Sequence, residues 1–176
     1  RGRPARTTSS TTRARARAGS SRRHRPGLAA QVGDRAQDLV LQRRPETVTA
    51  DGRVQAWVIG SGTDAAERGA AETAALRGIL NEAVPVVVDA GALDLVPGAS
   101  APVIVTPHAR ELTRLREALG LGVVDARDDD AREGVARETA EAVGGVVLSK
   151  GFVTIVAAPG GWSRRVSAGT PWLATA

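Results

Sequence analysis

The chain has 176 residues, of which 42% are hydrophobic and only 2% aromatic, so its core must be built from valine, leucine, isoleucine and alanine. This length suits one domain of ordinary size. The absence of cysteine excludes a disulfide scaffold, a thiolate metal site and a cysteine nucleophile. No apolar run approaches the roughly 20 residues that a membrane helix needs, so no membrane partner is expected.

The net charge of +5 originates at one end of the chain. Residues 1–26 contain nine arginines and no acidic residue, which leaves 15 basic against 19 acidic residues in the rest. We expect residues 1–26 to form a disordered arginine-rich tail and residues 27–176 to form the folded domain. The tail is open to three interpretations: an RNA-binding arm, a transit peptide, or upstream sequence without function, which we favour. The mildly acidic domain is not expected to bind nucleic acid specifically.

The apolar spacing predicts the following elements in chain order. A helix is expected around residues 28–42, then a strand at 54–59 that is apolar enough for burial on both faces. The helix predicted at 65–80 would turn Ala70, Ala74, Leu76 and Leu80 toward the sheet. Further strands are predicted at 84–89, 103–106, 145–149, 153–158 and 164–167. A short loop or helical turn is predicted at 90–95, and helices at 109–119, with Leu112, Leu115 and Leu119 on one face, and at 128–143.

Strands that alternate with helices predict an α/β domain with a doubly wound, mainly parallel sheet and helices on both faces. Right-handed crossovers would gather the loops after Ile59, Asp89, Thr106 and Ser149 at one edge of that sheet. Open α/β sheets bind their ligands at such an edge. Each of the four loops carries a polar or glycine cluster. The sequence therefore predicts a ligand site where these loops meet.

The first two loops offer small and acidic residues. Gly60 and Gly62 lie between a strand and a helix, where they would let a ligand approach backbone N–H groups. An ordinary tight turn explains them equally well, because the third glycine of the dinucleotide motif is missing. Asp64 suits a helix cap. Asp89, at the end of a strand, could bind a metal, a hydroxyl or a neighbouring arginine, or cap the turn that follows.

The last two loops carry the more reactive side chains. His108 and Glu111 are three residues apart at a helix start, so they face the same way and could bind or protonate a ligand. The alternative is that they only cap the helix, and we favour the ligand role. Lys150 and Gly151 could cradle a phosphate, or form a β-turn with a solvated lysine.

Four segments in this order resemble the ADP/ATP-dependent NAD(P)H-hydrate dehydratases of the ribokinase-like superfamily. They are Trp-Val-Ile-Gly-Ser-Gly-Thr at 57–63, Val-Val-Val-Asp-Ala-Gly-Ala-Leu at 86–93, Val-Ile-Val-Thr-Pro-His-Ala-Arg-Glu at 103–111 and Val-Leu-Ser-Lys-Gly-Phe-Val-Thr at 147–154. The Thr-Pro-His-x-x-Glu part is the most specific of them. The resemblance implies ADP- or ATP-dependent dehydration of hydrated NAD(P)H to NAD(P)H, which gives AMP or ADP plus phosphate.

The resemblance also implies roles for particular residues. Gly62 and His108 would bind the hydrated nicotinamide nucleotide, with support from Gly60, Asp89 and Glu111. The adenine nucleotide, ADP or ATP, would bind at Lys150, Gly151, Phe152, Val153 and Thr154. Mg2+ would arrive with the nucleotide phosphates, without a dedicated metal ligand in the chain. The enzyme would be cytoplasmic and, at full length, a homo-oligomer.

Three departures from the family pattern qualify this expectation. Gly91 stands where the family usually has a second aspartate. The family's Gly-x-Gly-Asp loop, which supplies the general base, would lie after Ala176, so we expect little or no turnover from these 176 residues. Residues 1–26 match nothing in the family. Two alternatives stay open: a small-molecule kinase of the same superfamily, and an inactive chain whose basic tail binds acidic partners.

Overall fold

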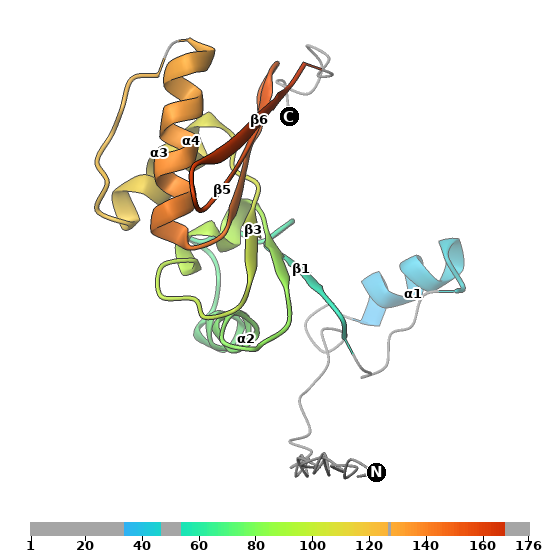
Figure 1. Cartoon of the computed structure of the whole chain (residues 1–176). Coiled ribbons are helices and arrows are strands. Elements are labelled where there is room, and N and C mark those ends of the chain that lie inside the picture. The colour runs from blue at the N-terminus through green and yellow to red at the C-terminus, as the bar shows by residue number, and fades with distance from the viewer. Residues whose placement is uncertain (1–33, 47–53, 127, 168–176) are drawn as a thin grey trace, which may run out of the picture. The chain divides into compact units, whose positions relative to one another are not determined.

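The computed structural model describes residues 34–46, 54–126 and 128–167 (Figure 1). The chain forms two compact units that divide between Asp51 and Gly52. The first unit contains helix α1 (Asp34–Arg43), which lies within the predicted range 28–42 except for its last residue. The start of that range lies outside the described residues, and so does the predicted tail 1–26. The expected boundary between residues 26 and 27 therefore stays a prediction.

The second unit is built on a six-stranded sheet whose strands follow each other in sequence order. The first four strands run parallel, and the last two add to the sheet in antiparallel fashion. This arrangement confirms a mainly parallel α/β sheet. The strands are β1 (Trp57–Ile59), β2 (Val86–Val88), β3 (Val103–Val105), β4 (Val146–Ser149), β5 (Thr154–Ala158) and β6 (Trp162–Val166).

Helical segments connect the parallel strands. They are α2 (Ala70–Leu80), the 3-10 helix η2 (Ala90–Leu95), α3 (Ala109–Ala118) and α4 (Asp129–Val143). Three of these segments match their predicted ranges closely. In α4, the Asp128 side chain caps the helix by accepting from the Ala131 N–H at 2.7 Å. The acidic residues that follow it lie in the first turn, where carboxylates suit the helix dipole.

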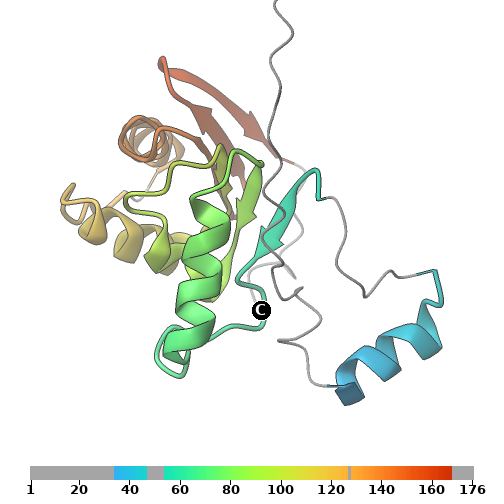
Figure 2. The same cartoon turned by 90° about the horizontal axis from the view of Figure 1, so that it is seen from below.

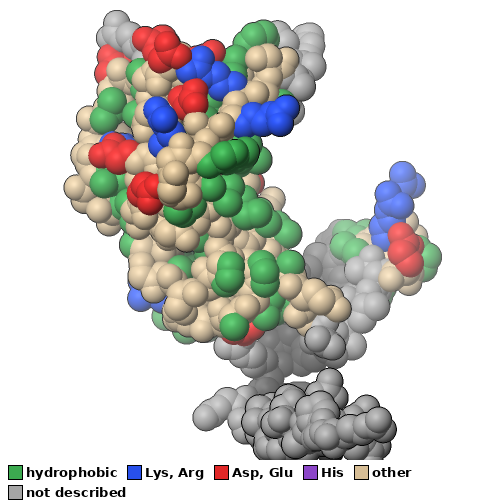
Figure 3. All heavy atoms as spheres, viewed as in Figure 1, with side chains coloured by type: hydrophobic (Ala, Val, Ile, Leu, Met, Phe, Trp, Pro, Cys, Tyr) green, Lys and Arg blue, Asp and Glu red, His purple; other side chains and the backbone are tan. Residues whose placement is uncertain are grey.

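Within residues 54–167 the helices lie on one face of the sheet (Figures 1 and 2). Right-handed crossovers between strands in unreversed order place every connection on the same side, so a second helical layer would need a reversal of strand order. On the opposite face, Val58 is 66% exposed and Ile104 is 40% exposed. Hydrophobic side chains are visible on part of the surface over the sheet (Figure 3). The prediction that the first strand is buried on both faces is wrong for this reason.

Helix α2 differs most from its prediction. It begins at Ala70, whereas the helix was expected from residue 65, and Gly69 precedes it without a side-chain cap. Asp64 instead accepts from the Ala66 N–H at 2.9 Å, so it caps a turn before the helix. The buried stripe consists of Leu76, Ile79 and Leu80. Ala70 and Ala74 are exposed, contrary to prediction, because the larger side chains at i, i+3 and i+4 decide which face is buried.

One hydrophobic cluster joins the helices to the inner face of the sheet. Valines of β2 and β3 form its centre, and Leu112 and Leu115 of α3 pack there as predicted. Arg116 lies in this layer at 2% exposure, between α3 and α4. Its guanidinium reaches Glu138 at 2.8 Å and the Thr139 hydroxyl at 3.1 Å, which compensates much of the cost of burying the charge. No described helix is long and apolar enough to cross a bilayer.

Candidate functional site

The carboxyl ends of β2, β3 and β4 meet at one edge of the sheet, as predicted, and there the side chains of Asp89, Thr106 and Lys150 form a cluster. Asp89 Oδ1 accepts from Thr106 Oγ1 and from Lys150 Nζ, both at 2.8 Å. The side chain of Asp89 makes no cap hydrogen bond to η2. Of the roles left open for Asp89, the structure shows contact with a hydroxyl group, that of Thr106, and the basic partner of Asp89 is Lys150 instead of an arginine. Lys150 is correspondingly not the free, solvated lysine of the β-turn alternative.

Glu111 extends this cluster toward α3. Its Oε2 atom lies 3.8 Å from Lys150 Nζ, and its side chain is only 17% exposed. Lys150 thus lies between two carboxylates, Asp89 and Glu111. An incoming phosphate group would have to compete with them for the ammonium group. The cluster provides one positive charge that is already positioned by hydrogen bonds and ion pairing.

We expect Asp89 to stabilise the protein only while it is ionised. Partial burial raises the pKa of its carboxyl group, but hydrogen bonds from Lys150 and Thr106 and the Lys150 charge outweigh burial, so the pKa is lower than usual. Since the unfolded-state pKa is about 3.9, this contribution is complete above about pH 4 and is lost as the pH falls through the folded-state pKa. The difference in free energy of unfolding between wild type and Asp89→Asn should shrink in that acidic range. Urea titrations at a series of pH values measure it, and a difference independent of pH would contradict the ion pair.

His108 is the N-cap of α3. Its Nδ1 atom accepts from the backbone N–H groups of Arg110 at 3.1 Å and Glu111 at 3.4 Å, while Glu111 Oε2 accepts from the His108 N–H at 2.8 Å. This capping box is the alternative that we ranked second from the sequence. The capping box leaves part of the ring accessible, because the side chain is 47% exposed, although its Nε2 atom lies 3.4 Å from Glu111 Oε1. A ligand could therefore meet His108 only at its Nε2 edge.

The two predicted glycines after β1 differ in their surroundings. Gly60 is buried with φ +98°, and a Cβ atom there would lie 1.9 Å from the Asp89 carbonyl oxygen. Gly60 therefore allows the first loop to pack against the second. Gly62 has φ +80°, is exposed, and would leave a Cβ atom free of contacts within 4 Å. Of the two, only Gly62 faces open space that a ligand could enter.

The segment at residues 150–154 consists of the loop that connects β4 to β5 and of Thr154, the first residue of β5. Its first N–H, on Lys150, donates to the Pro107 carbonyl oxygen at 2.8 Å, which ties it to the end of β3. At its other end, Thr154 Oγ1 contacts the Gly151 carbonyl oxygen at 3.5 Å. Phe152 is 64% exposed, and Val153 packs partly against the core. The five predicted nucleotide-binding residues thus form one short segment beside the Asp89 cluster.

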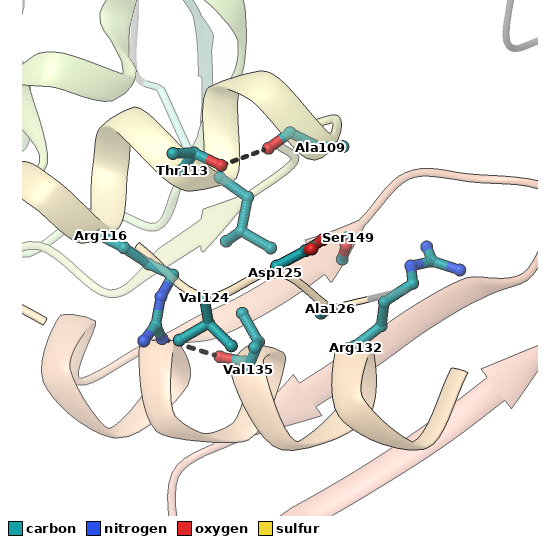
Figure 4. A pocket seen from close by; sticks show the side chains of 10 residues that line it. Ala109, Thr113, Arg116, Val124, Asp125, Ala126, Arg132, Val135 and Ser149 are labelled. Carbon is teal, nitrogen blue, oxygen red and sulfur yellow. Dashed lines mark hydrogen bonds between the residues drawn. The ribbon is translucent and has the colours of Figure 1, made fainter. Parts of the chain in front are cut away.

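Two cavities open near these loops. One, of about 310 Å³, lies between three elements: η2, α3 and the loop that follows β1. Its lining includes Thr63, which follows Gly62 in the chain, and Glu111, which contacts His108. The other, of about 220 Å³, lies between α3 and α4, with Arg116 and Arg132 on opposite sides in Figure 4. Ser149, immediately before Lys150, lines the second cavity. The first cavity therefore adjoins the predicted substrate side, and the second adjoins the predicted nucleotide loop.

Several contacts at this edge were missed from the sequence. Arg132 of α4 donates to the Val153 carbonyl oxygen at 3.0 Å. The almost buried Arg68 side chain donates to the Gly91 carbonyl oxygen and pairs with Asp94 at 2.6 Å. A Cβ atom at Gly91 would lie 1.8 Å from the Thr63 carbonyl oxygen, so a larger residue cannot occupy that position here. No sequence signal marked either arginine, because arginines are frequent throughout the chain.

The acidic groups of the described segments do not form a cage for a metal ion, since no cluster of three or more potential ligand side chains occurs there. Asp89 and Glu111 are the carboxylates beside Lys150. This donor set fits Mg2+ that is bound mainly by phosphate oxygens and water, as is usual for Mg2+ with nucleotides.

Comparisons with known proteins identify the family of this chain. A sequence profile of the family described as NAD(P)H-hydrate dehydratase matches residues 22–176. The bifunctional NAD(P)H-hydrate repair enzyme Nnr of Mycobacterium tuberculosis is 43% identical over 149 residues, which cover 78% of this chain and 29% of that protein. The ADP-dependent (S)-NAD(P)H-hydrate dehydratase of Neisseria meningitidis is 34% identical over 134 residues, or 70% of this chain and 43% of that protein.

Solved structures give the same picture. The ADP/ATP-dependent NAD(P)H-hydrate dehydratase of Bacillus subtilis, co-crystallised with ATP/Mg2+ and soaked with CoA, superposes with a TM-score of 0.62 and 27% identity over 80% of this chain and 54% of that one. A ribokinase-like superfamily protein of Enterococcus faecalis has a TM-score of 0.52 at 18% identity, over 80% of this chain and 46% of that one, which shows the fold. The chain thus spans about half the length of the Bacillus subtilis protein and slightly less than half of the Enterococcus faecalis protein.

Proposed function

Because the chain belongs to the NAD(P)H-hydrate dehydratase family, we propose that it acts in the ADP- or ATP-dependent dehydration of hydrated NAD(P)H. The products would be NAD(P)H, phosphate, and AMP or ADP. The observation that carries the proposal is the Asp89–Lys150 ion pair at 2.8 Å. It joins the predicted nucleotide loop to the edge where the predicted substrate contacts lie. Cytoplasmic location and homo-oligomerisation stay predictions.

The chemistry requires that a ring hydroxyl be turned into a better leaving group. Transfer of the terminal phosphoryl group of ADP or ATP to that hydroxyl would do so, and electrons of the ring nitrogen would then expel phosphate. Mg2+ held by the nucleotide phosphates would neutralise part of their charge. In this chain, Lys150 would bind the phosphates and Gly151 would let them approach the backbone.

The substrate side would be formed by Gly62 and His108. Gly62 faces open space, and its neighbour Thr63 lines the cavity of about 310 Å³. Because Nδ1 of His108 is occupied by the capping box, only the Nε2 edge is available to hydrogen-bond the hydrated ring or its amide. His108 would then orient the substrate, while the general base that completes the reaction is expected in the family's Gly-x-Gly-Asp loop.

The test is recovery of NADH absorbance from hydrated NADH in the presence of ADP and Mg2+, with the product of the full gene. We expect recovery with ADP or ATP, none without nucleotide, and a large loss in the His108→Ala variant. Binding of ADP to the 176-residue chain can be measured separately by calorimetry. Failure of the full protein to restore NADH, or phosphoryl transfer from ATP to a pyrimidine or thiazole alcohol instead, would contradict the proposal.

A further inference from the structure

We propose that Arg132 is a positioning residue for the nucleotide loop at residues 150–154. It would act by holding the backbone of Gly151 and Val153 in the conformation that receives the adenine nucleotide. This inference rests on the proposed function, since the ligand of the loop comes from there. The contacts of Arg132 with the loop are observed in the structure and do not depend on the identity of the ligand.

Arg132 is well placed to connect α4 with the loop. It lies in the first turn of α4, where its N–H donates to the Asp128 carbonyl oxygen at 3.0 Å. Its Nη1 pairs with Asp129 Oδ1 at 2.8 Å, and its Nη2 donates to the Val153 carbonyl oxygen at 3.0 Å. With a side chain 24% exposed, the guanidinium is partly shielded from water. A planar group fixed on one side by a carboxylate can hold a backbone carbonyl in a defined position.

Gly151 packs directly against the same guanidinium. A Cβ atom on Gly151 would lie 2.5 Å from Arg132 Nη2 and 3.3 Å from the Val153 carbonyl oxygen. Any larger residue would have to push the arginine away from its acceptor. The position of the Arg132 side chain therefore depends on the absence of a side chain at residue 151.

The loop is anchored from three sides. The Lys150 N–H is bound to Pro107, the Lys150 ammonium group to Asp89, and the Val153 carbonyl to Arg132. The first two anchors hold only the start of the loop. Phe152, between the anchors, is exposed. Loss of Arg132 should therefore release residues 151–153 while the Lys150 ion pair persists.

The experiment compares Arg132→Ala with Arg137→Ala, which removes an exposed arginine from the same helix. Cleavage of the ligand-free chain by chymotrypsin after the exposed Phe152 should speed up about tenfold in Arg132→Ala only, the effect expected from the loss of one charge-assisted hydrogen bond. The dissociation constant for ADP should rise about tenfold as well, with partial rescue in Arg132→Lys. Thermal unfolding of both variants shows whether the change is local.

A double-mutant cycle with Gly151→Ala completes the test. In a chain that retains Arg132, the methyl group that Gly151→Ala introduces would displace the arginine side chain. In the Arg132→Ala background there is no arginine to displace. The losses of ADP affinity caused by the two substitutions should therefore be less than additive. Additive effects, or equal rates of cleavage after Phe152 in Arg132→Ala and Arg137→Ala, would overturn the inference. A wild-type chain that binds no ADP would instead contradict the proposed function, and the rate of cleavage after Phe152 would still decide whether Arg132 holds the loop in place.

Discussion

Replacement of Lys150 by methionine should weaken ADP binding roughly 100-fold, because a charge-assisted contact to phosphate is lost and a carboxylate is left unpaired beside the phosphate site. In wild type, Lys150 Nζ lies 2.8 Å from Asp89 Oδ1 and 3.8 Å from Glu111 Oε2. Without the ammonium group, these carboxylates would repel the nucleotide. Isothermal titration calorimetry with ADP and Mg2+ measures the change in dissociation constant.

The double variant Lys150→Met/Asp89→Asn separates the two causes. Removal of the unpaired negative charge should recover about tenfold in affinity relative to Lys150→Met alone. Arg77→Met, in the last turn of α2, removes an exposed positive charge from the opposite edge of the sheet and should leave ADP binding unchanged. If Lys150→Met bound ADP as well as Arg77→Met does, Lys150 would have no part in nucleotide binding.

The parallel strands could be predicted because their residues leave few alternatives. Val103–Val105 is a β-branched run between two prolines, and its burial alternates as a strand covered on one face requires. Helix α2 was harder, because its start depends on a turn at Asp64 and on no side-chain cap. Which alanines face the core depends on where the larger apolar residues of the helix pack. This packing is decided by contacts between elements that are far apart in the sequence, so the spacing of residues within the helix does not reveal it.

The site was predicted as a set of loops but not as a set of contacts. Asp89 and Lys150 are 61 residues apart, and sequence order places them at one edge without showing that they pair. His108 illustrates the same limit, since a cap and a ligand contact require the same residue at the same position. The structure shows the cap through Nδ1, and the ligand contact through Nε2 stays a prediction.

Substitution of Gly60 by alanine should cost far more stability than the same substitution at Gly62. Both glycines have positive φ, so an alanine at either position would destabilise the folded state by about 1 to 2 kcal/mol through its left-handed backbone conformation. At Gly60 the new Cβ would also lie 1.9 Å from the Asp89 carbonyl oxygen and 2.7 Å from Ala92 Cβ, neither of which can move as a flexible side chain does. We expect a total loss of more than about 4 kcal/mol at Gly60, enough to unfold a domain of ordinary stability.

Urea denaturation of the two variants tests this difference, and Gly62→Ala is the matched control because its Cβ would meet nothing within 4 Å. The Gly62 variant should fold and retain ADP binding while it loses affinity for the hydrated nicotinamide nucleotide. The Gly60 variant should either fail to fold or shift Asp89 and so disturb its pair with Lys150. Equal losses of stability would mean that the loop after β1 does not pack against Asp89 as closely as the structure shows.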